Sequence, residues 1–110
     1  MTGDLVLGMA RNGGAVGFVT DGCVRDLVGL ENVGLPAWSM GVTPNSPHRS
    51  GPGTIGFPIQ LAGHRVCSGD IVVADRDGVV VIPLDMAESV LKKLPGIRQS
   101  EAAADESVRL

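Results

Sequence analysis

The apolar residues of this chain occur in short runs separated by glycine, proline and aspartate, and the spacing within each run predicts an element. From Asp4 to Asn12 several apolar residues fall on one helical face, with Asp4 as an N-cap-type acid, and Gly13-Gly14 end the run. Residues 15–20 (AVGFVT) are a compact apolar stretch typical of a buried strand, which ends at the Asp21-Gly22 turn signal. A helix followed by a buried strand is typical of an α/β fold.

The middle of the chain predicts shorter elements and one long loop. Residues 24–30 have the pattern of a short helical or turn segment, and residues 37–42 that of a strand after Pro36. Residues 43–56 are rich in proline, glycine and serine and have no periodicity, so we expect a loop, and long ordered loops are often functional.

Two pairs of apolar runs flank turn sequences and predict β-hairpins. The first pair, residues 57–61 and 64–67, flanks Ala62-Gly63. The second pair, residues 71–74 and 79–83, flanks a turn of two aspartates, an arginine and a glycine. The second arm of this hairpin is apolar throughout, so we expect it to be buried on both faces.

The end of the chain predicts helices. Apolar residues recur at helical spacing from Asp85 onward, and Pro95-Gly96 should end that helix. Residues 97–110 are polar and alanine-rich, which suggests a third helix or a tail with a thin apolar side. We therefore expect one domain over residues 1–96 and a C-terminal helix or tail over residues 97–110.

Composition and charge exclude several classes of protein. The chain has 110 residues and a formal net charge of −3 without clustered basic residues, which argues against nucleic acid as the main partner. No apolar run approaches the ~18 to 20 residues of a membrane span, and from the first residues we expect a protein without an export signal. Its two cysteines lie in no metal-binding or redox array, so we expect a cytoplasmic protein with free thiols.

The chain also lacks the common catalytic motifs. It contains no GxSxG nucleophile elbow, no HExxH metal site, no GxxxxGK phosphate loop and no Rossmann fingerprint. Its only lysines, Lys92 and Lys93, lie on the polar side of a predicted helix, where an amine is not desolvated for Schiff-base chemistry. What remains is chemistry based on carboxylates and arginine.

Three residues form the candidate constellation. Asp4 begins the first helix, and Arg25 and Asp26 follow the first strand after 20 intervening residues. A helix that runs antiparallel to its strand starts where that strand ends, so the two acids should converge near the guanidinium. Such a cluster suits Mg²⁺ or Mn²⁺, and the free amides of Leu5 and Val6 suit a substrate carboxylate. From spacing alone the simpler alternative is stronger, with Asp4 as a helix cap and Arg25–Asp26 as a surface ion pair.

These residues also carry a family resemblance. The run GDLVLGMARNGGAVGFVTDGCVRD, residues 3–26, resembles the active-site segment of the 4-hydroxy-4-methyl-2-oxoglutarate and 4-carboxy-4-hydroxy-2-oxoadipate aldolases, which share the RraA-like fold. Their signature is an aspartate, twenty residues and Arg-Asp. Residues 35–59 and 68–83 resemble further blocks of that family, so the similarity runs from residue 3 to about Glu88. The resemblance implies a swivelling β/β/α domain that packs as a trimer or as a hexamer of two trimers.

The resemblance also implies a reaction, the divalent-metal-dependent (class II) cleavage of a 2-oxo acid to pyruvate, with oxaloacetate decarboxylation as a side activity. Asp26 would ligate Mg²⁺ or Mn²⁺ directly and Asp4 through a water. Arg25 would hold the keto oxygen of the pyruvyl group, and the Leu5 and Val6 amides its carboxylate. Glu101 is the candidate for a glutamate that the family supplies from a neighbouring subunit.

Two alternatives stay open. One is a non-catalytic protein like the RraA regulators of ribonuclease E. The resemblance implies that these regulators lack the acid after the arginine, so the presence of Asp26 favours the enzyme. The other is an inactive fragment. Family members have a substantial portion before the position of Asp4, so we expect an N-terminally shortened form that recovers the missing pocket walls by oligomerisation.

Overall fold

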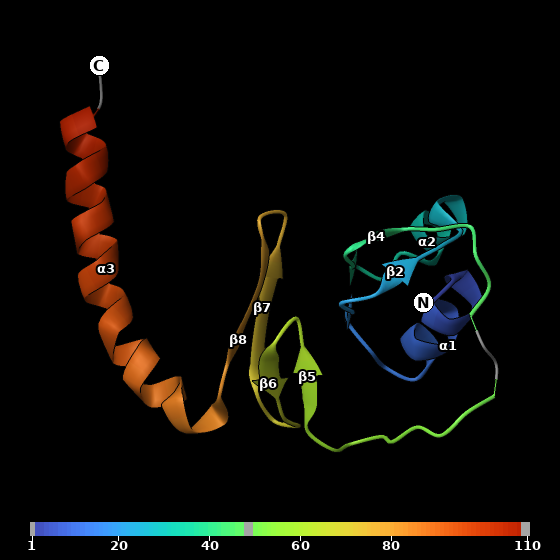
Figure 1. The fold of residues 1–110 in the computed structure, drawn as a ribbon. Coiled ribbons are helices and arrows are strands. Elements are labelled where there is room, and N and C mark those ends of the chain that lie inside the picture. The colour runs from blue at the N-terminus through green and yellow to red at the C-terminus, as the bar shows by residue number, and fades with distance from the viewer. Residues whose placement is uncertain (1, 48–49, 109–110) are drawn as a thin grey trace. The chain divides into compact units, whose positions relative to one another are not determined.

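The computed structural model describes residues 2–47 and 50–108, and the chain divides into two compact units, Met1–Arg65 and Val66–Leu110. Figure 1 traces the chain from its N-terminal helices to its C-terminal helix. Each unit has its own secondary structure and packing.

Two short helices form one side of the first unit. The helix α1 spans Asp4–Asn12 and α2 spans Leu27–Val33, and the two pack against each other, as Figure 1 shows. The predicted bounds of α1 are therefore confirmed. Gly34 follows α2 with φ 75° and ψ 11°, a left-handed conformation that ends many helices and that glycine adopts without steric cost.

Four two-residue strands pair beside these helices in the first unit. The strand β1 (Phe18–Val19) pairs in parallel with β3 (Ala37–Trp38), and β2 (Cys23–Val24) pairs in parallel with β4 (Gly41–Val42). Parallel neighbours need a crossover, and α2 lies in the connection within both pairs. The first unit is therefore α/β in organisation.

These strands differ from the predicted ones. The expected buried strand of residues 15–20 is only Phe18–Val19 and half-buried, because only these two residues have a pairing partner in β3, and Val16 is 90% exposed. The segment 24–30 begins as a strand before it becomes helical. The segment 37–42 is two strands separated by a bend, because its two halves pair with different partners.

The core of the first unit is small. It consists of four buried aliphatic side chains that join α1, β2, α2 and the segment after α2: Leu7, Val24, Leu30 and Leu35. Leu7 is 0% exposed, and full burial of a leucine contributes roughly 1.5–3 kcal/mol. These contacts hold the two helix starts beside the end of β2.

Both predicted hairpins are present. The strand β5 (Ile59–Leu61) pairs with β6 (His64–Val66) around Ala62-Gly63, whose φ angles of 48° and 83° are both left-handed. Positive φ at both central residues is the geometry of a two-residue hairpin turn. The backbone N–H of Ala62 also donates to Oδ2 of Asp21, at 3.0 Å.

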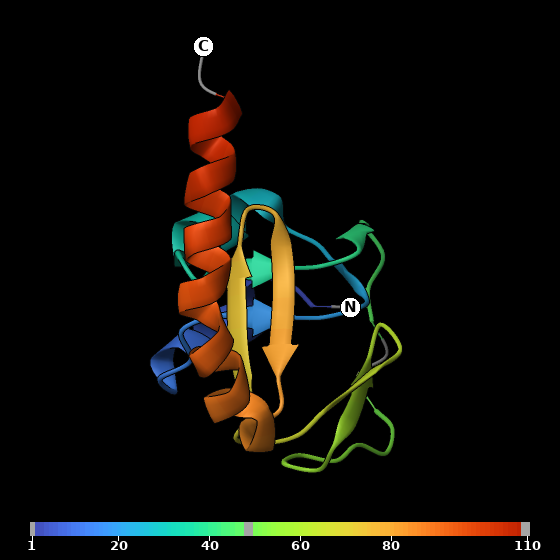
Figure 2. The same cartoon turned by 90° about the vertical axis from the view of Figure 1, so that its left-hand side faces the viewer.

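The second unit begins with the second hairpin. The strand β7 (Ile71–Asp75) runs antiparallel to β8 (Gly78–Ile82), and Figure 2 shows this hairpin face on. Ile71 lies opposite Ile82. Asp70 joins its two ends, because its carboxylate accepts from the backbone N–H groups of Cys67, at 2.9 Å, and Leu84, at 3.3 Å.

The predicted burial of the second arm on both faces is wrong for this chain. Val80, in β8, is 61% exposed, and Val72 and Val73 of β7 are 48% and 55% exposed. Valine and isoleucine favour strands through their branched side chains, so an apolar run can record strand preference without burial.

The C-terminal helix is longer than predicted. A 3₁₀ turn at Leu84–Met86 leads into α3, which spans Ala87–Val108 and contains Pro95. The predicted end at Pro95-Gly96 is therefore wrong. An interior proline costs about 3 kcal/mol, but good helix formers such as alanine, glutamate and lysine dominate the rest of α3 and offset that cost. Within the described residues, no helix has the length and apolar character that a membrane span requires.

Candidate active site at the starts of two helices

The backbone brings the start of α1 beside the end of β2. Thr2 forms a parallel bridge with Val24, its N–H donates to the carbonyl of Cys23 at 3.3 Å, and its carbonyl accepts from the N–H of Arg25 at 3.0 Å. Because the two segments run in the same direction, the residues that follow Thr2 continue beside those that follow Val24. The Gly3-Asp4 segment is therefore placed next to Arg25 and Asp26.

Gly3 provides the space in which the Asp26 carboxylate lies. A methyl group on Gly3 would be 2.7 Å from Oδ2 of Asp26 and 3.2 Å from Nε of Arg25. The backbone of Gly3 is extended, with φ −117° and ψ −174°, which any residue adopts. A β-carbon here would therefore force the Asp26 carboxylate to shift, so glycine matters at this position for space and not for its backbone freedom.

Asp4 has the reciprocal contact on the other helix. Its carboxylate occupies the position that a methyl group on Gly29 would need, and Gly29 is the third residue of α2. Asp4 is the first helical residue of α1, the N-cap is Gly3, and the Asp4 side chain lies against α2. The expectation that Asp4 caps α1 is therefore wrong. The convergence of the two carboxylates stays a prediction, with Asp4 lying against Gly29 and Asp26 against Gly3.

Asp26 has an unusual backbone. It is the N-cap of α2 and is left-handed, with φ 62° and ψ 52°. Aspartate tolerates this region better than most residues, yet the conformation still costs about 1–2 kcal/mol. Backbone strain of this kind clusters at functional sites, and here it accompanies a carboxylate that lies over Gly3.

Arg25 has two side-chain partners. Its Nε lies 3.6 Å from Oδ2 of Asp26, with side chains 30% and 44% exposed, so the ion pair of the simpler alternative does exist. Its Nη1 donates to Oγ of Ser46 at 2.9 Å. Among the residues that the structure describes, Nη2 has no acceptor, and it remains available to an oxygen of a bound molecule.

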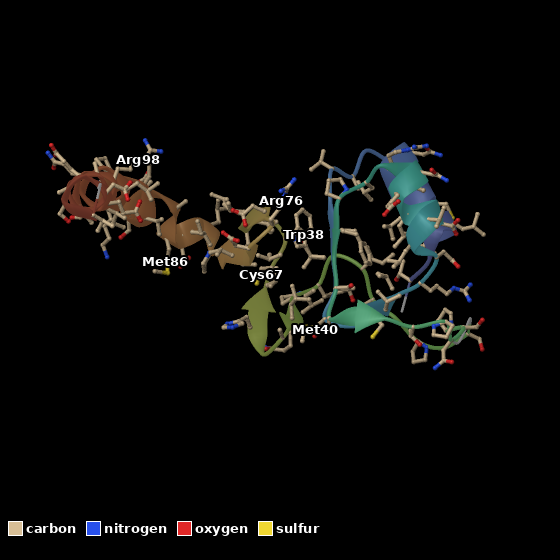
Figure 3. All side chains as sticks on the ribbon, turned by 90° about the horizontal axis from the view of Figure 1, so that it is seen from above. Trp38, Met40, Cys67, Arg76, Met86 and Arg98 are labelled. Carbon is tan, nitrogen blue, oxygen red and sulfur yellow. The ribbon has the colours of Figure 1, made fainter. Side chains whose placement is uncertain are left out.

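The other site residues from the sequence lie as follows. Leu5 and Val6 are in the first turn of α1, where backbone N–H groups have no partner within a helix, and their side chains are 81% and 52% exposed. Glu101 is exposed on α3, three residues after Arg98, which Figure 3 labels on that helix.

The donor set fits a hard divalent cation. Across residues 2–47 and 50–108 there is no group of three or more acidic, histidine or cysteine side chains that could hold a metal. Mg²⁺ is nevertheless commonly bound through one or two carboxylates while it keeps several waters. Asp26 and Asp4, at the adjacent starts of two helices, can supply those carboxylates.

An apolar groove in the first unit has no comparable chemistry. It is lined by parts of β2, α2 and the segment that continues to β4, and among the residues that the structure describes Glu31 is the only ionisable one in its lining. Asp4, Arg25 and Asp26 are absent from its lining. The candidate site therefore rests on the acid–arginine cluster.

Gly3, Gly29 and Ser46 were not predicted as parts of the site. Ser46 lies in the segment 43–56, where the only expectation from the residue pattern is that long ordered loops are often functional. The two glycines carry no side-chain signal, and their role follows only from what lies against them.

Two acids and an arginine at the starts of adjacent helices in an α/β unit are typical of a site for a small molecule. Comparison of the sequence with known proteins identifies the family of this chain. The RraA-like family, described as Aldolase/RraA, matches residues 1–81. This chain belongs to the RraA-like family.

Two relatives have names that assign them an aldolase activity only provisionally. A 4-hydroxy-4-methyl-2-oxoglutarate aldolase of Halalkalibacterium halodurans is 36% identical over 108 residues, covering 98% of this chain and 51% of the relative. The corresponding aldolase 2 of Arabidopsis thaliana is 30% identical over 78 residues, covering 71% of this chain and 47% of the relative. The chain thus spans about half the length of these relatives.

Solved structures agree with the family. RraAS2 of Streptomyces coelicolor, a member of the RNase ES inhibitor RraA protein family, superimposes with a TM-score of 0.84 at 30% identity, covering 97% of this chain and 55% of that one. An uncharacterized protein of Pseudomonas syringae gives a TM-score of 0.81 at 28% identity, covering 100% and 57%. The expected RraA-like α/β fold is therefore confirmed.

Proposed function

We propose that this chain carries the acid–arginine site of a divalent-metal-dependent class II pyruvate aldolase, which cleaves substrates like 4-hydroxy-4-methyl-2-oxoglutarate and also decarboxylates oxaloacetate. The observation that carries the proposal is the reciprocal packing of Asp26 on Gly3 and Asp4 on Gly29, with Arg25 beside Asp26. The aldolase names of the relatives support the same reaction class.

The substrate is a 2-oxo acid held at three points. The Leu5 and Val6 N–H groups, at the positive end of the α1 dipole, bind the carboxylate. The guanidinium of Arg25 donates to the keto oxygen through Nη2. Asp26 and, through a water, Asp4 would hold Mg²⁺ or Mn²⁺, which would supply electrophilic stabilisation to the keto oxygen.

Bond cleavage places negative charge on the oxygen that Arg25 contacts. In the aldol reaction a water-relayed base takes the C4 hydroxyl proton, the C3–C4 bond breaks, and its electron pair moves into the enolate of pyruvate. In oxaloacetate the bond to the C4 carboxylate breaks and releases CO₂, leaving the same enolate. Protonation at C3 then gives pyruvate in both cases. A fixed donor aimed at the developing charge stabilises the transition state more than the substrate.

A second copy of the chain completes the site in this proposal. Glu101 of one copy, carried on the exposed α3, reaches the site of another within a homotrimer or a hexamer. This assignment is supported by the family resemblance. Its role is to assist the proton transfer, since carboxylates act as general acids and bases when they are within hydrogen-bond reach.

The test is release of pyruvate from oxaloacetate, with Mg²⁺ and with a chelator. We expect Mg²⁺-dependent release above the rate with the metal ion alone, and a loss of roughly 100-fold or more in Asp26→Asn. The matched control is Glu31→Gln, which removes one negative charge from the same helix at an exposed position outside the cluster. Equal rates for the unsubstituted chain and Asp26→Asn would refute the proposal.

The second candidate is a non-catalytic regulator, favoured by the likeness to a member of the RNase ES inhibitor RraA family. An inhibitor acts through a surface and needs no acid–metal site. Inhibition of a ribonuclease of the RNase E type that persists in Asp26→Asn, without pyruvate release by the unsubstituted chain, would decide for this candidate.

A further inference from the structure

We propose that Ser46 is a positioning residue for Arg25: its hydroxyl fixes the guanidinium so that Nη2 faces the keto oxygen of the substrate. The inference rests on the proposed function and adds to it a residue from the long loop of residues 43–56. It starts from the hydrogen bond between Nη1 of Arg25 and Oγ of Ser46, at 2.9 Å, which joins positions 21 residues apart.

The backbone holds Ser46 at this place. The N–H of Thr43 donates to the carbonyl of Val24 at 2.9 Å, so the loop begins in register with the residue before Arg25. The N–H of Asn45 then donates to Oγ1 of Thr43 at 3.3 Å, which turns the chain locally. The contact of Ser46 with Arg25 therefore follows from the pairing of β2 with β4 and from the turn after it.

A neutral acceptor suits this position. The arginine side chain has large rotamer freedom, and Arg25 is 30% exposed, so its partners must restrain it. A second carboxylate would restrain it as well, but would also compensate the positive charge that the substrate oxygen needs. A hydroxyl fixes one nitrogen of the guanidinium and leaves that charge largely available. Ser46 and Asp26 thus hold two of the three nitrogens, and the third faces the substrate.

The experiment measures binding of oxalate, a planar dianion that resembles the enolate of pyruvate, by titration calorimetry at fixed saturating Mg²⁺. We expect Ser46→Ala to weaken oxalate binding by roughly 10-fold, the size of a charge-assisted hydrogen bond. Ser46→Thr keeps the hydroxyl and should restore the affinity to within about two-fold. The control, Ser50→Ala, removes a hydroxyl from the same loop at an exposed position and should leave the affinity unchanged.

The outcomes separate this inference from the function on which it rests. Loss in Ser46→Ala with rescue in Ser46→Thr supports it, because a loop that is merely disordered would not be restored by a hydroxyl. Unchanged affinity in Ser46→Ala, with loss in Arg25→Ala, overturns the role of Ser46 and leaves the proposed function standing. Absence of Mg²⁺-dependent oxalate binding by the unsubstituted chain overturns both.

Discussion

Substitution of Gly3 is the sharpest perturbation of the site. A single added β-carbon should displace the Asp26 carboxylate, and the choice of serine or alanine changes the capping of α1 independently. A β-carbon at this position would lie 2.7 Å from Oδ2 of Asp26, whereas ordinary contact begins at 3.4 Å, so the Asp26 carboxylate must shift by about 0.7 Å. Shifts approaching 1 Å in a reacting group cost up to about 100-fold in rate. We therefore expect roughly 10-fold to 100-fold slower pyruvate release in Gly3→Ser and Gly3→Ala.

The two substitutions differ in their effect on stability. Gly3 is the N-cap of α1, where serine is better than glycine by a few tenths of a kcal/mol and alanine is worse. Gly3→Ser should therefore unfold in urea at the same or a slightly higher concentration, whereas Gly3→Ala should be destabilised by about 0.5–1 kcal/mol. Both should lose activity to a similar extent. Full activity in a stable Gly3→Ser protein would refute the claim that the space at Gly3 sets the position of the Asp26 carboxylate.

Three further predictions concern the backbone. Asp26→Asn should change the free energy of unfolding by only a few tenths of a kcal/mol, because asparagine tolerates the left-handed region. Asp26→Ala should cost about 1 kcal/mol, and urea unfolding of both variants distinguishes the effect of backbone strain from that of charge. Ala62→Asn should stabilise the protein by about 0.5–1 kcal/mol in the same assay, since Asn-Gly favours the turn between β5 and β6, and destabilisation would contradict the turn geometry. Pro95→Ala should raise the melting temperature of α3 with little gain in circular dichroism at 222 nm, since the helix already continues through Pro95; a large gain would mean that the helix ends there in solution.

Local patterns predicted the elements whose signals are local. The start and end of α1 follow from helical spacing and the Gly13-Gly14 stop, and both hairpins follow from their turn residues. The end of α3 was not predictable from Pro95 alone, because the helix preference of a long surrounding segment outweighs one unfavourable residue. The split of residues 37–42 into β3 and β4 depends on which strands they pair with, and this information lies elsewhere in the chain.

The charged residues of the candidate site were candidates from the sequence alone, and the residues that support them were not. The spacing of Asp4, Arg25 and Asp26 predicts that the acids lie near each other, because a helix start and a strand end share one edge; the structure places Asp26 against Gly3 and Asp4 against Gly29. Ser46 could not be assigned, because its contact with Arg25 is set by the register of β4 on β2. The left-handed backbone of Asp26 was equally hidden, since aspartate is common in ordinary conformations as well.

The most direct test is exchange of the methyl protons of pyruvate in D₂O, followed by proton NMR, because it requires only that the site stabilise the enolate. With Mg²⁺ present, the chain should accelerate loss of the methyl signal above the rate with Mg²⁺ alone. Arg25→Ala and Asp26→Asn should abolish this acceleration, and Glu31→Gln should retain it. Exchange no faster than with Mg²⁺ alone, or equally fast in Asp26→Asn, would contradict the assignment of the acid–arginine cluster as an enolate-stabilising site.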